Sequence, residues 1–281
     1  MKKNIFVFTF SCIAYTTLLA NGGSTGLTFL QLGIGARAVA MGEAYTAIAN
    51  DGSALFFNPA ALSFAKQTEL MLMHKEWIAG STTEFFSSTI HGEKISYGMS
   101  LNATSVSDIE IRTQPGPAQG TFSARNVAFS GALSYALINS LSIGMNGKYL
   151  YEKIFVNEAN GYALDFGASY YVDEHLSLGV ALANIGSMNE LRTETSKLPS
   201  TVRAGAGYSA LFEDNFKYTF SGDIVKLFSE KTIRTHLGGE IVYNNLVALR
   251  AGYQFGYEIK NISTGFGVHY GIVQFDYAFV P

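Results

Sequence analysis

The chain has 281 residues, of which 48% are hydrophobic and only 15% are charged. Soluble domains usually carry roughly 25% charged residues, so this composition provides little charge for a water-facing surface. The formal net charge of −3, without any cluster of lysine and arginine, argues against a nucleic-acid partner. Beyond the N-terminus, no apolar run approaches the ~20 residues that a membrane-spanning helix requires, which favours strands.

The N-terminus has the pattern of an export signal. Two lysines at positions 2–3 precede the apolar run 5–14, and residues 18–20 form a small-residue cleavage site. We therefore expect residues 1–20 to be a signal peptide. The single cysteine, Cys12, lies within the apolar run, so the mature chain is expected to have no disulfide, no thiol nucleophile and no cysteine metal site.

The segment that follows, residues 21–66, differs from the rest of the chain. Its alanine content favours short helices, and its small residues allow close packing. Asp51 or Ser53 can cap a following turn, and Asn58-Pro59 is a natural start for a turn or helix. Such a segment would fit inside a barrel, and we predict that it forms a lumenal hatch.

From about Thr68 onward, apolar and polar residues alternate with a period of two. The alternation predicts thirteen strands, joined mostly by short turns that suit antiparallel hairpins. The predicted strands are 68–77, 83–90, 94–106, 125–137, 141–154, 161–172, 176–186, 201–211, 216–227, 232–244, 246–258, 261–270 and 272–280. Residues 107–124 and 187–200 lack the alternation and are predicted to be longer, extracellular loops.

One predicted strand, 246–258, illustrates the two faces. Its apolar face holds Val247, Leu249, Ala251, Tyr253, Phe255 and Tyr257, and its other face holds Arg250, Gly252, Gln254, Gly256 and Glu258. An apolar face that suits lipid, a polar face that suits water and aromatic residues near strand ends are typical of transmembrane barrels. Because lipid offers no hydrogen-bond partners, the sheet must close.

The predicted fold class is therefore all-β: a transmembrane antiparallel β-barrel over residues 67–281, with the hatch in its lumen. A soluble β-sandwich or lipocalin-like barrel is the alternative. It would bury its apolar face and would need more charge on the outside than this chain has.

The hatch segment resembles the opening of the PorV/PorQ family of outer-membrane proteins, a UPF0164-like group. It is also similar to the start of FadL-type transporters of hydrophobic compounds, which share an Asn-Pro-Ala motif. The matching residues are Gly35 to Ala38, Met41 to Ala44, Asp51, Asn58 to Ala60, His74 to Ile78 and Asp276 to Pro281. The resemblance implies fourteen strands and a lumenal hatch. Relatives usually continue with one more strand. We therefore expect about fourteen strands, with two alternatives: either the count of thirteen has missed or split a strand, or the last strand is missing because the sequence is truncated or the barrel incomplete.

Two groups of residues are candidates for a functional role. The first is expected to position or gate the hatch, or else to serve only its folding: Arg37, Glu43, Asp51, Asn58, Pro59 and Ala60. The second is expected to face the lumen and to hold the hatch or shape a water-filled interior: Asp165, Arg203, Asp223, Arg234, Glu240 and Arg250.

No motif selects a catalytic site. The five histidines are scattered without metal-ligand spacing and are interpreted as solvated polar residues. Gly33 and Gly35 lack the buried strand that precedes a phosphate loop. We expect no enzymatic activity, no cofactor and no metal, with an outer-membrane hydrolase as the alternative.

The resemblance implies a component of the bacterial outer membrane that is either associated with type IX secretion or structural. The alternative function is passive transport of hydrophobic small molecules through the hatch-gated lumen. The expected partners are accordingly outer-membrane lipid and either secretion-system or secreted proteins or hydrophobic small molecules, but no nucleic acid.

Overall fold

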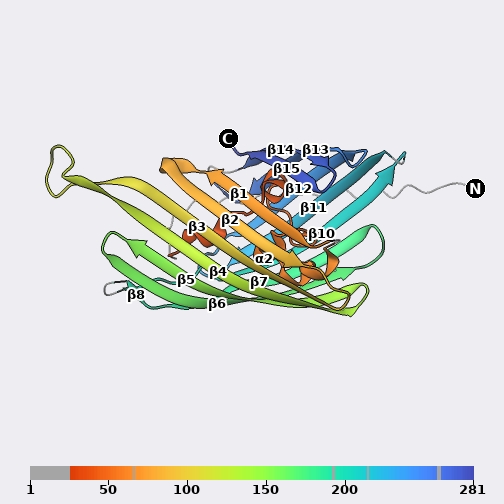
Figure 1. The fold of residues 1–281 in the computed structure, drawn as a ribbon, viewed down its shortest axis with the longest axis horizontal. Helices are drawn as coiled ribbons and strands as arrows, with labels where there is room; N and C mark the ends of the chain where they lie inside the picture. Colours follow the sequence, from red (N-terminus) through yellow and green to blue (C-terminus); the bar gives the residue numbers. More distant parts are fainter. Residues whose placement is uncertain (1–25, 66, 192–193, 214, 258–260) are drawn as a thin grey trace, which may run out of the picture.

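The computed structural model describes residues 26–65, 67–191, 194–213, 215–257 and 261–281. The predicted signal peptide lies outside the described residues. Within them, thirteen antiparallel strands form one sheet that curls into a barrel around the N-terminal segment (Figure 1). Among the described residues the first and last strands of this sheet are not hydrogen-bonded to each other, so the predicted closure of the sheet is not seen. No helix in this part of the chain is both long and apolar enough to cross a membrane.

The sheet follows the chain order, with every strand hydrogen-bonded to the next. Its strands are β1 (Glu69–Glu76), β2 (Ser81–Ile90), β3 (Ile95–Ile111), β4 (Gly120–Ile138), β5 (Leu141–Ile154), β6 (Asn157–Tyr171), β7 (Leu176–Met188), β10 (Thr201–Phe212), β11 (Phe216–Leu227), β12 (Ile233–Tyr243), β13 (Val247–Phe255), β14 (Ile262–Tyr270) and β15 (Val273–Phe279). The predicted number of strands is confirmed. A separate hairpin consists of β8 (Glu190–Leu191) and β9 (Glu194–Thr195).

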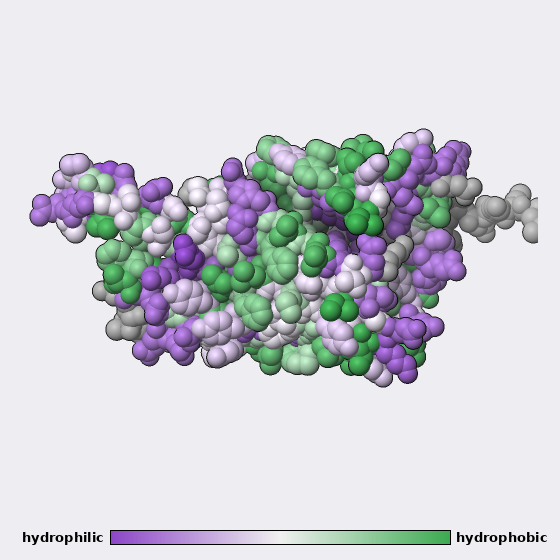
Figure 2. Space-filling view, viewed as in Figure 1, coloured by the Kyte–Doolittle hydropathy of each residue, from purple (hydrophilic) through white to green (hydrophobic). Residues whose placement is uncertain are grey.

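The wall has an apolar outer face and a polar inner face. Along β2, for example, Thr83, Ser87 and Thr89 are buried toward the lumen, whereas Phe86 between them is exposed. Large apolar residues point outward on every long strand, and Leu72 on β1 is 81% exposed. Apolar side chains gather over the middle of the face drawn in Figure 2, with hydrophilic ones toward its two ends. This distribution is that of a wall surrounded by lipid.

The described part of the N-terminal segment, residues 26–65, is called the plug here. It contains η1 (Thr28–Gln31), α1 (Ala36–Ala40), α2 (Ala54–Phe57) and η2 (Pro59–Phe64). Tyr45, Leu55, Phe57 and Leu62 of the plug form its apolar core and are almost fully buried. Hydrophobic burial therefore occurs around the plug, in a lumen whose wall is otherwise polar.

The barrel has a loop end, where the β3–β4 hairpin projects, and a turn end, where tight turns join β4 to β5 and β6 to β7 (Figure 1). The predicted loop 107–124 is shorter in the structure, because β3 continues to Ile111 and β4 begins at Gly120. A register shift between Val106 and Ile109, with Asp108 at φ 56°, interrupts the alternation there. Because the bulge breaks the alternation of apolar and polar residues, the sequence pattern did not predict the outer part of this hairpin.

Candidate functional site

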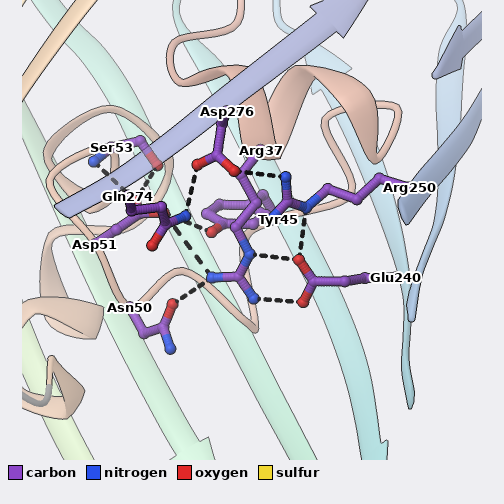
Figure 3. Close-up of polar contacts among 9 residues, drawn as sticks. All are labelled: Arg37, Tyr45, Asn50, Asp51, Ser53, Glu240, Arg250, Gln274 and Asp276. Carbon is purple, nitrogen blue, oxygen red and sulfur yellow. Dashed lines mark hydrogen bonds and ion pairs between the residues drawn. The ribbon is translucent and has the colours of Figure 1, made fainter. Parts of the chain in front are cut away.

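A network of charged side chains joins α1 to the wall on β12, β13 and β15 (Figure 3). The Arg37 guanidinium on α1 donates to both carboxylate oxygens of Glu240, from Nε at 2.8 Å and from Nη2 at 2.8 Å. Its Nη1 donates to Asn50 Oδ1 at 2.7 Å. Two parallel hydrogen bonds fix both the distance and the orientation of the pair.

The second arginine of this network belongs to the wall. Arg250 Nε donates to Glu240 Oε2 at 2.6 Å, and Arg250 Nη1 donates to Asp276 Oδ1 at 2.7 Å. Glu240 therefore lies between Arg37 and Arg250, one from the plug and one from β13. The buried charges are paired within the network, which a site of low polarity requires.

Asp51 organises the plug segment that leads into α2. Its Oδ2 accepts a hydrogen bond from Tyr45 Oη at 2.6 Å, and its Oδ1 accepts from the Ser53 backbone N–H at 2.9 Å. The Arg37 guanidinium lies 5.5 Å from the centre of the Tyr45 ring. Asp51 thus links the turn before α2 to the same face of the plug that carries Arg37.

A second wall carboxylate, Asp223 on β11, binds the plug backbone. Asp223 Oδ2 accepts from the backbone N–H groups of Tyr45 and Thr46, at 3.1 and 2.9 Å, and from Thr46 Oγ1 at 2.6 Å. Three donors on one oxygen hold this turn of the plug against the wall.

Asn58 connects two parts of the plug to β6. Its Nδ2 donates to the carbonyl oxygens of Thr46 at 3.0 Å and Ala168 at 3.1 Å, while its Oδ1 accepts from Ala60 N at 3.1 Å. Pro59 is the first residue of η2, where its lack of an N–H has no cost. Residues 58–60 therefore start η2 and fasten it to the wall.

The wall opposite η2 has glycine where the plug backbone approaches. A Cβ at Gly144 on β5 would lie 2.5 Å from the Ala60 nitrogen. Ala60 O also accepts hydrogen bonds from Ser134 Oγ at 2.7 Å and Ser142 Oγ at 2.8 Å. Ala60 itself is fully buried, so its short side chain and that of the facing glycine permit this contact.

Glu43, the remaining plug candidate, is buried just after α1 with φ 59°. Its backbone carbonyl lies 3.4 Å from Nδ1 of His236, and His236 Nε2 lies 3.1 Å from Tyr257 Oη. The interpretation of all histidines as solvated was therefore wrong for His236, which is completely buried. Gly256, at φ 87°, interrupts the alternation after β13, so Tyr257 is half-buried beside lumenal residues rather than on the lipid face.

Asp165 on β6 supports an irregularity of β7. It accepts from the Asn184 backbone N–H at 2.7 Å and forms an ion pair with Lys148 Nζ at 2.7 Å. Asn184 has φ 60°, and the register with β6 shifts there. Lys148 was not among the sequence candidates, although its even spacing from Asn146 and Glu152 on β5 placed it on the polar face.

Beyond the same irregularity, toward the loop end, β7 separates from β10 while it remains paired with β6. β7 pairs with β10 only as far as Ala183, opposite Thr201, whereas it pairs with β6 up to Met188. Of the intervening chain, residues 196–200 lie against the plug, where Leu198 belongs to the same buried apolar cluster as Leu27 and Phe29. The predicted loop 187–200 is thus partly strand, since β7 runs to Met188 and β8 and β9 lie within it, and its residues 196–200 cover part of the plug.

A small cavity, called the lumenal cavity here, lies beside this division between the plug and the wall. It has room for about one water molecule. Its lining is shared by the plug and the wall and comprises Leu30, Gln31, Phe56, Lys148, Ala183, Asn184, Thr201, Arg203, Val225, Leu227, Arg234 and Tyr257.

Arg203 and Arg234, two of the predicted lumenal residues, meet at this cavity. The Arg203 guanidinium lies 5.4 Å from the Phe57 ring centre, and that of Arg234 lies 4.6 Å from the Tyr257 ring centre. Arg234 Nη2 also forms an ion pair with Glu230 at 2.6 Å. The six predicted wall residues thus fall into three places: Glu240 and Arg250 at α1, Asp223 at the 45–46 turn, and Asp165, Arg203 and Arg234 around or near the cavity.

Among the residues that the structure describes, no group of three or more His, Cys, Asp or Glu side chains is arranged to hold a metal ion.

The model of an uncharacterised protein family, UPF0164, matches residues 19–186, which is more than half of the chain. No curated protein matches the chain. Among solved structures, the toluene transporter TodX of Pseudomonas putida is 13% identical, with 88% of this chain and 91% of that chain covered and a TM-score of 0.60.

Two further structures have the same architecture. The toluene transporter TbuX of Ralstonia pickettii is 12% identical, covers 85% of this chain and 90% of its own, and has a TM-score of 0.57. A FadL homologue of Pseudomonas aeruginosa is 12% identical, with 88% and 90% covered and a TM-score of 0.53. These likenesses confirm the predicted antiparallel barrel of FadL type.

Proposed function

The chain belongs to the uncharacterised protein family UPF0164, and from that premise we propose that it is a plugged barrel of the bacterial outer membrane. In this proposal, small molecules with an apolar part pass through it when the plug shifts. The observation that carries the proposal is the lumenal cavity, which lies between the plug and the wall at the place where β7 and β10 part.

The wall and the relatives support the same proposal. The apolar outer face suits lipid, and the polar inner face suits a passage that is closed by a separate segment. The solved structures of similar fold include two toluene transporters. Because their identity to this chain is low, they support a barrel that transports small molecules without naming the molecule.

Many contacts hold the plug, and three of them join it to the wall at separate places where a single side chain can be removed, so its release is testable. We propose that Arg37 with Glu240, Asp223 with the 45–46 turn and Asn58 with β6 act as three latches that keep the lumen closed. Glu43, Asp51, Pro59 and Ala60 shape the plug so that these latches meet the wall. Each latch combines a wall group with a plug group, so a shift of the plug requires their separation.

The experiment compares single-channel conductance in planar bilayers for the chain, a variant lacking residues 28–63, and the double variant Arg37→Ala with Asp223→Ala. We expect low conductance for the chain, and stable open currents for the deletion and at least intermittent openings for the double variant. Arg112→Ala, which removes an exposed arginine of the β3–β4 hairpin, is the matched control. Equal conductance and equal detergent resistance in all four proteins would contradict a gating plug.

A second candidate function follows from the resemblance of the plug sequence to the PorV/PorQ family, namely an association with type IX secretion. It is favoured by the β3–β4 hairpin, which projects at the loop end, and by the exposed Phe155 and Val156 beside it. Phe122 of the hairpin packs edge-on against Phe155, with ring centres 5.5 Å apart. Such a surface suits a protein partner.

The two candidates separate in a cross-linking experiment in the native host. A photoreactive residue at Val156 would capture a secretion-system or secreted protein if the second candidate is right, and the same residue at Ile143 in the apolar outer face would not. Capture at neither position, together with flux of small molecules through the barrel, would leave only the transport function.

A further inference from the structure

Three cationic side chains from three different strands line the lumenal cavity. Lys148 comes from β5, Arg203 from β10 and Arg234 from β12. None of the described lining residues carries a carboxylate. The apolar part of the lining includes Leu30 and Phe56 of the plug and Val225 and Leu227 of β11.

The three cations differ in how their donors are used. Lys148 Nζ is bound by Asp165 at 2.7 Å and donates to Asn184 Oδ1 at 2.8 Å. Arg234 uses Nη2 for Glu230, but its buried Nε has no hydrogen-bond partner among the residues that the structure describes. The wall thus supplies Arg234 with only part of the hydrogen bonds that its guanidinium can donate.

Arg203 is the least satisfied of the three. Its side chain is buried, with the residue only 7% exposed, and its buried Nη1 has no hydrogen-bond partner in the described structure. It lies over the rings of Phe56 and Phe57, at 5.9 and 5.4 Å from their centres. The Asp223 carboxylate attracts Arg203 electrostatically, but its Oδ2 accepts hydrogen bonds from the plug backbone. A buried guanidinium donor without an acceptor is costly.

We propose that the lumenal cavity binds an oxyanion group, a carboxylate or a phosphate, through Arg203 and Arg234, with Lys148 contributing positive charge. An arginine fork presents the planar pair of donors that such a group accepts, and an aromatic hydrocarbon offers nothing to satisfy them. The inference rests on the proposed function and deepens it, because it assigns to this barrel anionic ligands rather than neutral ones.

The size of the cavity decides which part of the ligand it holds. With the plug in place there is room for about one water molecule, so a head group fits but a longer body does not. Ala183, Val225 and Leu227 form the apolar side toward the division between β7 and β10. The oxyanion is therefore either a small free ion or the end group of a ligand whose apolar part extends along this side.

Isothermal titration calorimetry on the folded chain in a non-ionic detergent tests the proposal with four probes: acetate, inorganic phosphate, octanoate below its micellar concentration, and toluene. We expect saturable binding of at least one anion, weakened at least tenfold by Arg203→Gln and by Arg234→Gln. Arg125→Gln, an exposed arginine of β4, should leave it unchanged. Arg203→Lys keeps the charge and should weaken binding less than Arg203→Gln.

Binding of acetate or phosphate would identify a free ion, whereas binding of octanoate alone would identify the end group of an amphipathic ligand, and both outcomes support the site. No saturable binding of any anion, or binding that is equal in both glutamine variants and the chain, would overturn it. Heat-modifiability on gels verifies that each variant is folded. If toluene permeates only after the plug is released and no anion binds, the proposed function stands and this inference fails.

Discussion

Glu240 is the wall residue that joins Arg37 of α1 to β13, because it binds one arginine of the plug and one of the wall. Removal of Arg37 leaves Glu240 paired with Arg250, whereas removal of Glu240 takes a carboxylate from both arginines at once and leaves Arg250 with Asp276 as its remaining ion-pair partner. Breaking a buried ion pair by removing one partner typically costs about 3 to 5 kcal/mol.

We therefore predict that Glu240→Ala lowers the free energy of unfolding by about 3 to 5 kcal/mol and that Arg37→Ala lowers it by clearly less. Urea unfolding followed by gel mobility measures both. Glu84→Ala, which removes an exposed partner of His74, is the control and should change little. A cost for Arg37→Ala equal to that for Glu240→Ala would contradict the shared role of Glu240.

A second residue-scale prediction concerns Asp173 in the turn between β6 and β7. Its Oδ1 accepts backbone hydrogen bonds from Leu176 at 2.7 Å and His175 at 2.8 Å, and these lower the pKa of the Asp173 carboxyl below its ordinary value of 3.8. A lowered pKa in the folded state stabilises the turn above that ordinary value, and the contribution is lost as the pH falls through the lowered pKa.

Hydrogen exchange at the His175 and Leu176 amides measures this effect. The protection of both amides should decrease as the pH is lowered from 5 to about 2, after correction for the intrinsic exchange rate. In Asp173→Ala the protection should be low throughout and should lack this pH dependence. A pH dependence retained by the alanine variant would assign the effect to another group.

At this scale the sequence predicted the side chains but not their partners. Arg37 and Asn58 were recognised from the opening phrase, and Asp223 and Glu240 from alternation within their strands. Arg37 and Glu240 are 203 positions apart in the chain, so their pairing depends on how the whole sheet curls around the plug. Lys148 could have been included among the lumen-facing candidates, because the alternation along β5 places it on the polar face.

At the scale of the elements, the plug and the wall fit because the wall has a glycine, without a side chain, where η2 approaches. Gly144 is the clearest case, since its missing side chain leaves space for the backbone of residues 59–60. Gly131 lies on the neighbouring strand β4, where an added Cβ would meet nothing within 4 Å. The two glycines therefore form a matched pair for substitution.

Gly144→Ala should displace η2 or strain β5, at a cost of about 1 to 3 kcal/mol as in other overpacked sites. It should also raise the conductance in planar bilayers, although every residue of the plug is intact. Gly131→Ala should leave both quantities close to those of the unaltered chain. If the two variants behaved alike, the close approach of η2 would have no role in closing the lumen.

Most strand bounds were predicted from the sequence to within a few residues, because the alternation reports directly which side chains face lipid and which face the lumen. β5 and β11 agree with the structure at both ends. The prediction failed where a bulge changes the phase, at Asp108 in β3, and where a positive φ ends the pattern, at Gly256 after β13. Alternation cannot continue across such residues, so the β3–β4 hairpin and Tyr257 were misplaced.

At the scale of the whole molecule, simple hairpin connectivity explains why the fold class was predictable. Each strand pairs with the next one along the chain, so the alternation and the turns suffice to give the order of the sheet. The division between β7 and β10 was not predictable, because it arises from a single inserted residue at Asn184 and from the folding of residues 196–200 over the lumen.

The position of α1 has a consequence for the order in which the barrel assembles. α1 precedes every strand in the chain, yet it contacts β13, β14 and β15, the last strands of the sheet. Those contacts join the two extremes of the sequence, and such long separations slow folding. The contacts between α1 and the wall can therefore form only once β13, β14 and β15 are in place, so the attachment of α1 belongs to the steps of assembly that join the two ends of the sequence.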